Sequence, residues 1–154
     1  MSAEARLKEL DLKLPPPPKP GGVYKPVVIV GNLCYVSGHG PWQDDATFMT
    51  GRVGSEIDQQ AGYNAARQCA LVILTTLKTQ LGSLDRVKRV IKTLGMVNAA
   101  PDFKNHPAVI NGFSELFAQV FGEEHGVGAR SAVGMGSLPG NISVEVEVIL
   151  ELSS

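Results

Sequence analysis

The sequence has few cysteines, few aromatic residues and almost no net charge. Its 154 residues include two cysteines, aromatic residues make up 6%, and 14 lysines and arginines nearly balance 15 aspartates and glutamates, for a net charge of −1. A basic surface that would attract a phosphate backbone or an anionic membrane is therefore not expected, and neither are stacking platforms for bases. We expect no nucleic-acid partner and no membrane partner.

The cysteines and histidines show no spacing that would hold a metal. Cys34 falls in an expected strand and Cys69 in an expected helix, so both are interpreted as reduced, buried thiols. None of the three histidines has a carboxylate or a cysteine at ligand spacing. The glycine-rich segment 134–140 leads into a strand instead of a helix, which argues against a nucleotide-binding loop. No metal and no cofactor are expected.

Long hydrophobic runs are also missing. The longest, such as residues 70–74, are far too short to cross a bilayer, and charged residues interrupt the leucines near the N-terminus, so no signal peptide is expected. We therefore expect a cytoplasmic protein. Hydrophobic residues at 44% and charged residues at 19% are typical of a globular chain, and 154 residues suit one domain with one core.

The N-terminal segment is interpreted as an arm that lies on the body of the protein. Residues 2–10 carry leucines on one side of a predicted short amphipathic helix. Four consecutive prolines at 15–18 end this helix and impose an extended course. We divide the chain into an arm over residues 1–20 and a single domain over residues 21–154.

The domain alternates strands and helices. Two β-rich runs flank Gly31-Asn32, which favours a hairpin. Helical spacing opens at Ser55, which has an acid three positions later as in a capping box, and Gly82 ends it. A second helix begins near Pro107 and stops at Gly122. The predicted strands lie at 27–30, 33–37 and 86–97, with two more in 129–152.

The segment 129–152 predicts two strands joined by a tight turn at residues 138–141. From Ile142 onward apolar and polar residues alternate, so one face of the last strand is expected in the core while the other carries glutamates. Arg130 opens the first strand and Glu145 lies on the second. If the turn makes these strands neighbours, the two side chains lie near one another at the same level of the sheet.

The two helices are too few to cover both faces of a sheet with this many strands. We therefore predict an α+β fold in which both helices pack on one face of the sheet. The opposite face, which bears the glutamates, must then meet solvent or other subunits.

Arg130 and Glu145 are the residues best suited to chemistry. A guanidinium keeps its charge and binds a carboxylate with two parallel hydrogen bonds, which makes Arg130 a natural anchor for a small keto or imino acid. The alternative for Arg130 is a structural ion pair or a solvated strand residue. A partly buried Glu145 would have a raised pKa and could activate water as a general base. Its alternative is an ordinary acid on a polar face, as Glu147 is interpreted to be.

The order and spacing of several motifs resemble the Rid family, the reactive intermediate deaminases also called YjgF proteins and formerly endoribonuclease L-PSP. The C-terminal signature is Arg-Ser-Ala-Val at 130–133, then Leu-Pro at 138–139 and an alternating Val-Glu strand. Earlier motifs agree, and the resemblance runs from about residue 20 to residue 152. The earlier motifs are Gly22-Val-Tyr24, the segment Gly31 to Gly38 with Pro41, Gly82-Ser-Leu-Asp-Arg-Val87 and Val109-Ile-Asn111.

The resemblance implies a chorismate mutase-like fold with one mixed sheet, and a homotrimer whose sheets close around a central barrel. It also implies roles for individual residues: Arg130 grips the substrate carboxylate and Glu145 positions the attacking water. Tyr24 would orient substrate across a subunit boundary, Asn111 would donate to a substrate oxygen, and Gly38 would line the pocket with its backbone. From the residues alone, the alternatives are a packing residue for Tyr24, a solvent-facing helix residue for Asn111 and an ordinary turn for Gly38.

The chain departs from the family pattern beside the expected pocket. Ala132 stands where a cysteine is frequent, and His39 stands where glutamine is usual. Val23 replaces a common proline, extra residues separate Phe103 from Asn111, and the N-terminal arm is an addition. We include Ala132 and His39 among the expected substrate-binding residues, and these departures would suit a substrate that differs in size or polarity from the small enamines of the family.

These features favour an enzyme similar to a 2-iminobutanoate/2-iminopropanoate deaminase, a hydrolase that converts small carboxylate-bearing enamines and imines into 2-keto acids and ammonium. The alternative is a trimeric protein that binds a carboxylate metabolite for regulation, without turnover. Ribonuclease action ranks last because the charge balance and the low aromatic content provide no surface for RNA.

Overall fold

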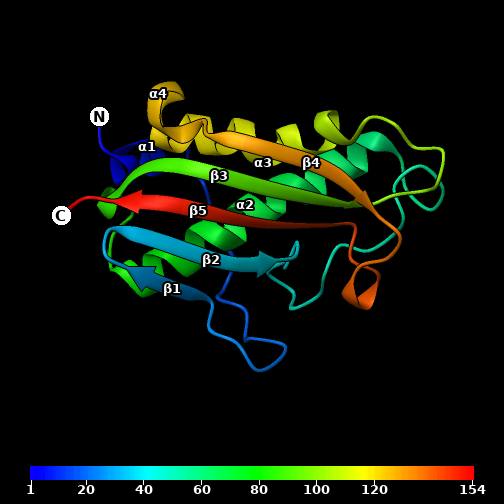
Figure 1. Ribbon diagram of the computed structural model, residues 1–154, viewed down its shortest axis with the longest axis horizontal. Helices are drawn as coiled ribbons and strands as arrows, with labels where there is room; N and C mark the ends of the chain where they lie inside the picture. Colours follow the sequence, from blue (N-terminus) through cyan, green and yellow to red (C-terminus); the bar gives the residue numbers. More distant parts are fainter.

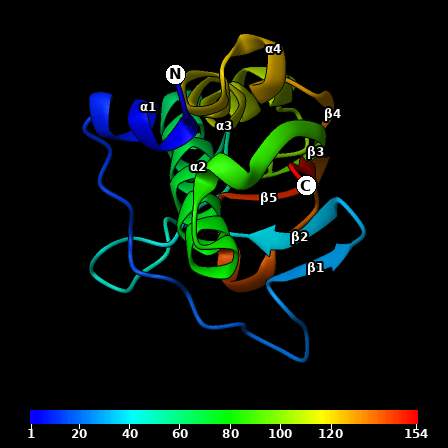
Figure 2. The ribbon, with the colours of Figure 1, turned by 90° about the vertical axis from the view of Figure 1, so that its left-hand side faces the viewer.

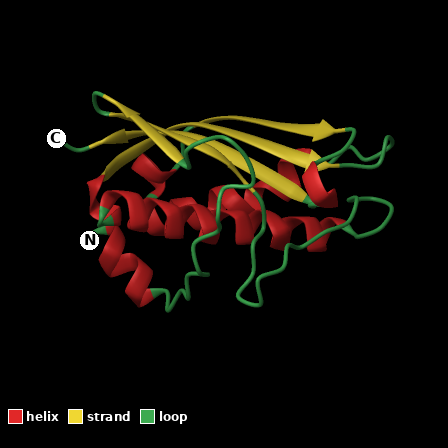
Figure 3. Cartoon of the chain, turned by 90° about the horizontal axis from the view of Figure 1, so that it is seen from below, coloured by secondary structure: helices red, strands yellow, loops and turns green.

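A five-stranded sheet and a layer of helices on one of its faces make up the computed structural model, which describes all 154 residues (Figures 1 and 3). The strand order is β1-β2-β5-β3-β4, and only β3 and β4 run parallel. The α+β class, the mixed sheet and the helices on one face are confirmed. The elements are α1 (Ala3–Glu9), β1 (Val27–Val30), β2 (Leu33–His39), α2 (Gln59–Leu81), η1 (Leu84–Arg86), β3 (Val87–Asn98), α3 (His106–Phe121), α4 (Glu123–Gly126), β4 (Ala129–Met135), η2 (Pro139–Asn141) and β5 (Val144–Leu152).

The prediction that the last two strands pair with each other is wrong. β3 lies between β4 and β5, so the segment 136–143 joins two strands that are not neighbours (Figure 1). The chain leaves β3 through α3 and returns as β4, parallel to β3, because a crossover of this length permits parallel pairing. β5 then enters between β2 and β3, where both of its edges find partners.

The alternation in β5 is confirmed by burial. Its alternate residues Val144, Val146 and Val148 are buried with Leu150 and Leu152 under the helices α2 and α3. Phe113 and Phe117 of α3 are among the largest fully buried side chains. These contacts form one core between the sheet and the two long helices.

The glycines of the sequence correctly predicted a hairpin turn and the end of a helix. The hairpin at Gly31-Asn32 forms, with Gly31 at a positive φ of 61°, and Gly82 follows α2 with φ 83°. Ser55 is not the N-cap of α2, because that residue lies in a preceding turn and the Asp58 carboxylate accepts a hydrogen bond from the Ala61 amide at 2.8 Å. The short acid that seemed the second member of a capping box is the cap itself.

Both cysteines, Cys34 in β2 and Cys69 in α2, are free and fully buried. Burial raises the pKa of each thiol. The interpretation of both as buried thiols is therefore confirmed, and their reduced state stays a prediction.

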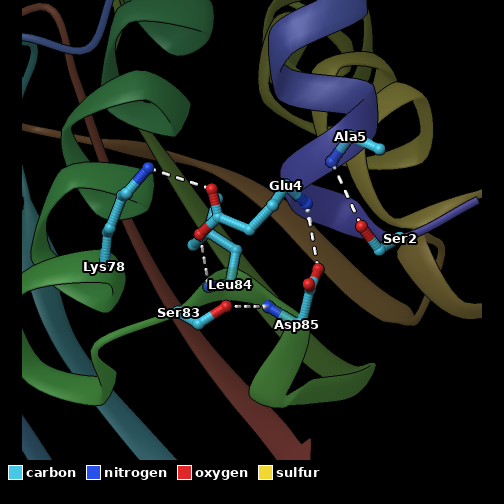
Figure 4. Close-up of polar contacts among 7 residues, drawn as sticks. All are labelled: Ser2, Glu4, Ala5, Lys78, Ser83, Leu84 and Asp85. Atoms are coloured by element: carbon cyan, nitrogen blue, oxygen red, sulfur yellow. Dashed lines mark hydrogen bonds and ion pairs between the residues drawn. The ribbon is translucent and has the colours of Figure 1, made fainter.

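The arm is bound to the outer side of α2 (Figures 2 and 4). Glu4 of α1 pairs with the Lys78 ammonium at 2.9 Å, and its other carboxylate oxygen accepts from the Leu84 amide at 2.9 Å. The Thr75 hydroxyl donates to the Pro15 carbonyl at 2.8 Å, so the proline segment also follows α2. The arm therefore covers the helical layer and leaves the opposite face of the sheet open.

Candidate active site

Arg130 lies on the edge strand β4, with its side chain on the helical side of the sheet. Its Nη1 donates to the Asn111 side-chain oxygen at 2.8 Å and to the Ser114 hydroxyl at 3.2 Å, both on α3. None of the ion pairs of the protein includes Arg130. Neutral groups thus orient a half-buried guanidinium whose charge has no counterion, which leaves it ready for an anionic ligand.

The strand beyond Arg130 carries small residues on the same face. Ala132 follows two positions later and is partly buried against the core, and Gly134 lies beside the His106 ring at the start of α3. A Cβ at Gly134 would come within 2.5 Å of His106 Nε2. Gly134 therefore lets the His106 ring of α3 pack against β4, on the face of the strand that carries Arg130.

Glu145 lies on the opposite, open face of the sheet. Its carboxylate is half-buried against Gly38 of β2, where a Cβ would come within 2.5 Å of Oε2. Burial raises the pKa of Glu145, and the nearby Glu147 carboxylate raises it further. A carboxyl group with a raised pKa is suited to accept a proton from water near neutral pH.

Arg130 and Glu145 do not come together within one protomer. Thr93 of β3 pairs with Arg130 and Val148, whereas Met96 pairs with Glu145, so the two residues differ by three positions along the sheet, roughly 10 Å. Because β-strand residues alternate between faces, this odd offset places the two side chains on opposite faces. The expected approach at one level of the sheet is wrong, since it assumed that the two strands were neighbours.

Three of the five remaining predicted residues lie with Arg130 or with Glu145. Asn111 and Ala132 lie with Arg130 at the edge formed by β4 and α3, whereas Gly38 lies with Glu145 at β2. Tyr24 precedes β1 and is 49% exposed, with its hydroxyl accepting from the Gly21 amide at 3.1 Å.

His39 is placed differently from the other predicted residues. Only 6% of it is exposed, and its Nε2 lies 2.9 Å from the Thr76 hydroxyl of α2, so the ring points into the helical layer.

Ser114 belongs to the Arg130 group although sequence reasoning did not select it. It lies three residues after Asn111 on α3, and residues at this spacing share a helix face. The helical period could have revealed it once Asn111 was chosen.

The open face of the sheet carries exposed apolar residues and a shallow hollow. Val28, Val30 and Tyr35 are exposed on β1 and β2, together with Val133 on β4. A hollow of about 380 Å³ is lined by Lys92 and Ser131, and the Lys92 ammonium donates to the Ser131 hydroxyl at 3.1 Å. No helix of the protein is both long and apolar enough to span a membrane, and no cluster of three or more His, Cys, Asp or Glu side chains is arranged to hold a metal ion.

Comparisons with known proteins agree on one family. The family model described as "YjgF/chorismate mutase-like, putative endoribonuclease" matches residues 4–152. Protein TCP17 of Trypanosoma cruzi is 42% identical over 150 residues, which cover 97% of this chain and 94% of TCP17. The crystal structure of Atu1372 from Agrobacterium tumefaciens, a protein of unknown function, has 44% identity and a TM-score of 0.88, over 98% of this chain and 94% of that one. RidA from the Antarctic bacterium Psychrobacter sp. PAMC 21119 has 28% identity and a TM-score of 0.62, over 88% and 94% of the two chains.

Proposed function

Because this chain belongs to the YjgF/Rid family, we propose that it hydrolyses reactive enamine and imine acids to 2-keto acids and ammonium. The observation that carries the proposal is the Arg130 guanidinium, which Asn111 and Ser114 orient and which no carboxylate neutralises. Such a group selects a planar carboxylate, the feature that all imino acids derived from amino acids share.

The chemistry needs positioning and one activated water. Arg130 holds the substrate carboxylate, and an enamine substrate first tautomerises to the imine, whose carbon is electrophilic. Glu145 accepts a proton from water while the oxygen adds to the carbon of the protonated imine, and Glu145 then passes this proton to the nitrogen and is ionised again. The C–N bond breaks as the hydroxyl oxygen forms the carbonyl, and the departing ammonia takes up the hydroxyl proton as ammonium. No electrons are transferred, so the reaction consumes only water.

We do not propose ribonuclease activity, although the family description names an endoribonuclease. The net charge of −1 and the 6% content of aromatic residues provide neither a basic groove nor stacking surfaces for RNA.

The proposed site requires more than one protomer. Arg130 and Glu145 occupy opposite faces of one sheet, and we therefore propose that Arg130 at the β4 edge of one subunit and Glu145 of another form the two walls of each site. The exposed apolar residues of the open face, including Val28 and Tyr35, support an assembly that covers this face. We propose a homotrimer in which the open faces surround a central barrel and in which Tyr24 reaches toward the neighbouring site.

Complementation between inactive subunits tests the shared site. We expect Arg130→Ala and Glu145→Gln subunits, each nearly inactive alone, to regain activity when they are co-expressed. Random trimers would recover roughly a quarter of the wild-type activity, because about three quarters of them are mixed and each mixed trimer has one intact site. Sedimentation velocity of the wild type checks the trimer itself. A monomer, or a mixture that stays inactive, would contradict this arrangement.

Turnover by the wild-type protein tests the proposed function. An amino acid oxidase generates imino acids in situ, and the protein is expected to accelerate release of 2-keto acid and ammonium above the spontaneous rate. The control is the same assay with heat-inactivated protein. Spontaneous rates across a panel of imino acids would rule out the enzyme. Saturable binding of 2-keto acids without turnover would then favour a regulatory protein, an alternative that the departures at Ala132 and His39 motivate.

A further inference from the structure

The strand β2 contains a bulge next to Glu145. Its pairing with β5 is regular through Val36 and resumes at His39 with a shifted register, so Ser37 and Gly38 form the irregular segment. The Gly38 backbone lies so close to the Glu145 carboxyl that no larger residue fits without displacing it. The conformation of this bulge therefore determines where the carboxyl can lie.

The His39 side chain connects this bulge to the helical layer. Its Nδ1 lies 2.5 Å from the Ser37 carbonyl oxygen, and its Nε2 lies 2.9 Å from the Thr76 hydroxyl oxygen of α2. A carbonyl oxygen only accepts, so Nδ1 carries a proton and donates to Ser37. In the neutral ring Nε2 is then the acceptor for the Thr76 hydroxyl. Burial lowers the pKa of His39, which favours this neutral form.

Ser37 extends the same connection to the segment before β1. Its hydroxyl donates to the Lys25 carbonyl at 2.6 Å, and its amide donates to the Pro26 carbonyl at 2.9 Å. The residue that His39 holds is thus bonded to the segment that follows Tyr24.

We propose that His39 is a positioning residue of the proposed reaction, which holds the Ser37–Gly38 bulge against Glu145 through the contacts of its ring with the Ser37 carbonyl and the Thr76 hydroxyl. We call these three groups the His39 clamp. This inference rests on the proposed function, but it gives His39 a role other than substrate contact. It also gives a role to a buried imidazole whose ring faces α2, while its backbone pairs with Val146, the residue after Glu145.

The clamp has a distinct kinetic consequence. Loss of the clamp lets the bulge relax, which shifts the Glu145 carboxyl away from the attacking water. Misplacement of a reacting group by about 1 Å can cost on the order of 100-fold in rate, so we expect kcat to fall by about 10- to 100-fold. Arg130, which holds the substrate carboxylate, is oriented by Asn111 and Ser114 of α3 and not by the clamp, so KM is expected to change little.

The decisive comparison uses two adjacent threonines of α2. Thr76→Val removes the hydroxyl that contacts His39, whereas Thr75→Val removes a buried hydroxyl that bonds the Pro15 and Leu71 carbonyls instead. We expect Thr76→Val to lower kcat with KM preserved, and Thr75→Val to keep both values. His39→Leu should act like Thr76→Val, while His39→Asn, which retains a donor for the Ser37 carbonyl, should recover part of kcat.

A readout without catalysis separates failure of the clamp from failure of the proposed function. The amide resonance of Gly38 in two-dimensional NMR is expected to shift in Thr76→Val and in His39→Leu, but not in Thr75→Val. An active wild type whose kcat is equally insensitive to Thr76→Val and His39→Leu would overturn the clamp alone. An unmoved Gly38 resonance would also overturn it, whatever the activity. A wild type without turnover would overturn the proposed function and with it the positioning role.

Discussion

Replacing Arg130 with alanine is expected to lower kcat/KM for imino acid hydrolysis by roughly 30-fold to several thousand-fold. The range follows from the 2–5 kcal/mol that is lost when one partner of a buried, hydrogen-bonded charge pair is removed, at about 1.4 kcal/mol for each factor of ten. The substrate carboxylate would lose its cationic partner and face the neutral groups of Asn111 and Ser114 alone. The oxidase-coupled release of 2-keto acid measures the effect.

Arg130→Lys is the matched variant for this experiment. It keeps the positive charge but loses the planar fork that binds both carboxylate oxygens, so its kcat/KM should lie between those of the wild type and Arg130→Ala. The Arg130 side chain contacts α3 through polar groups that are only partly buried, and we therefore expect both variants to fold. A folded Arg130→Ala protein with wild-type kcat/KM would remove the basis of the proposed function.

Replacing Glu145 with glutamine is expected to lower kcat by about 10²- to 10⁴-fold, the usual contribution of a positioned general base. Glutamine keeps the shape of the side chain beside Gly38 but cannot accept the proton from water. Glu147→Gln is the matched control, because Glu147 lies two residues away on the same face and is exposed. The control should retain kcat near pH 8. Equal kcat in the wild type and in Glu145→Gln would exclude Glu145 as the base.

The pH profile provides a second check on Glu145. The base works only when ionised, so activity should fall as the pH drops through the Glu145 pKa. Since burial and Glu147 raise that pKa, the acid limb of kcat/KM should lie above the ordinary glutamate value. Glu147→Gln removes one cause of the shift and should move the acid limb to lower pH.

Ionisation of Glu145 is expected to raise activity but to lower the free energy of unfolding. A carboxyl whose pKa is raised by folding contributes stability that is present at low pH and is lost as the pH rises through the folded-state pKa. Glu145→Gln should therefore be at least as stable as the wild type at neutral pH, measured as the free energy of unfolding in urea. Lost activity with retained stability is the expected signature of a functional group held at a structural cost.

Local patterns predicted those parts of the fold that local physics controls. The alternation of β5 identified its buried face because side chains along a strand alternate between two environments. Gly31 and Gly82 marked a hairpin and a helix end because their backbones adopt positive φ. The capping residue of α2 was misplaced from Asp58 to Ser55, since both are good caps and only the hydrogen bond to Ala61 distinguishes them.

The sequence predicted which residues belong to the candidate site better than it predicted how they are arranged. Arg130, Asn111 and Ala132 do lie together, and so do Glu145 and Gly38. Their separation into two groups depends on β3 lying between β4 and β5, a pairing between segments that are distant in the chain. The inward orientation of His39 depends on α2 in the same way.

The sequence by itself determined the family, the kinds of element and their order, and the small set of side chains with chemical potential, because these follow from residue types and from spacings along the chain. Only the tertiary structure decided which strands pair, that Arg130 and Glu145 occupy opposite faces, and that His39 joins the Ser37 carbonyl to Thr76. Strand pairing is a choice among long-range partners with similar local patterns, and the packing of the whole core makes that choice. Because β3 lies between β4 and β5, Arg130 and Glu145 of one chain lie apart on opposite faces, and the proposed site takes them from different subunits.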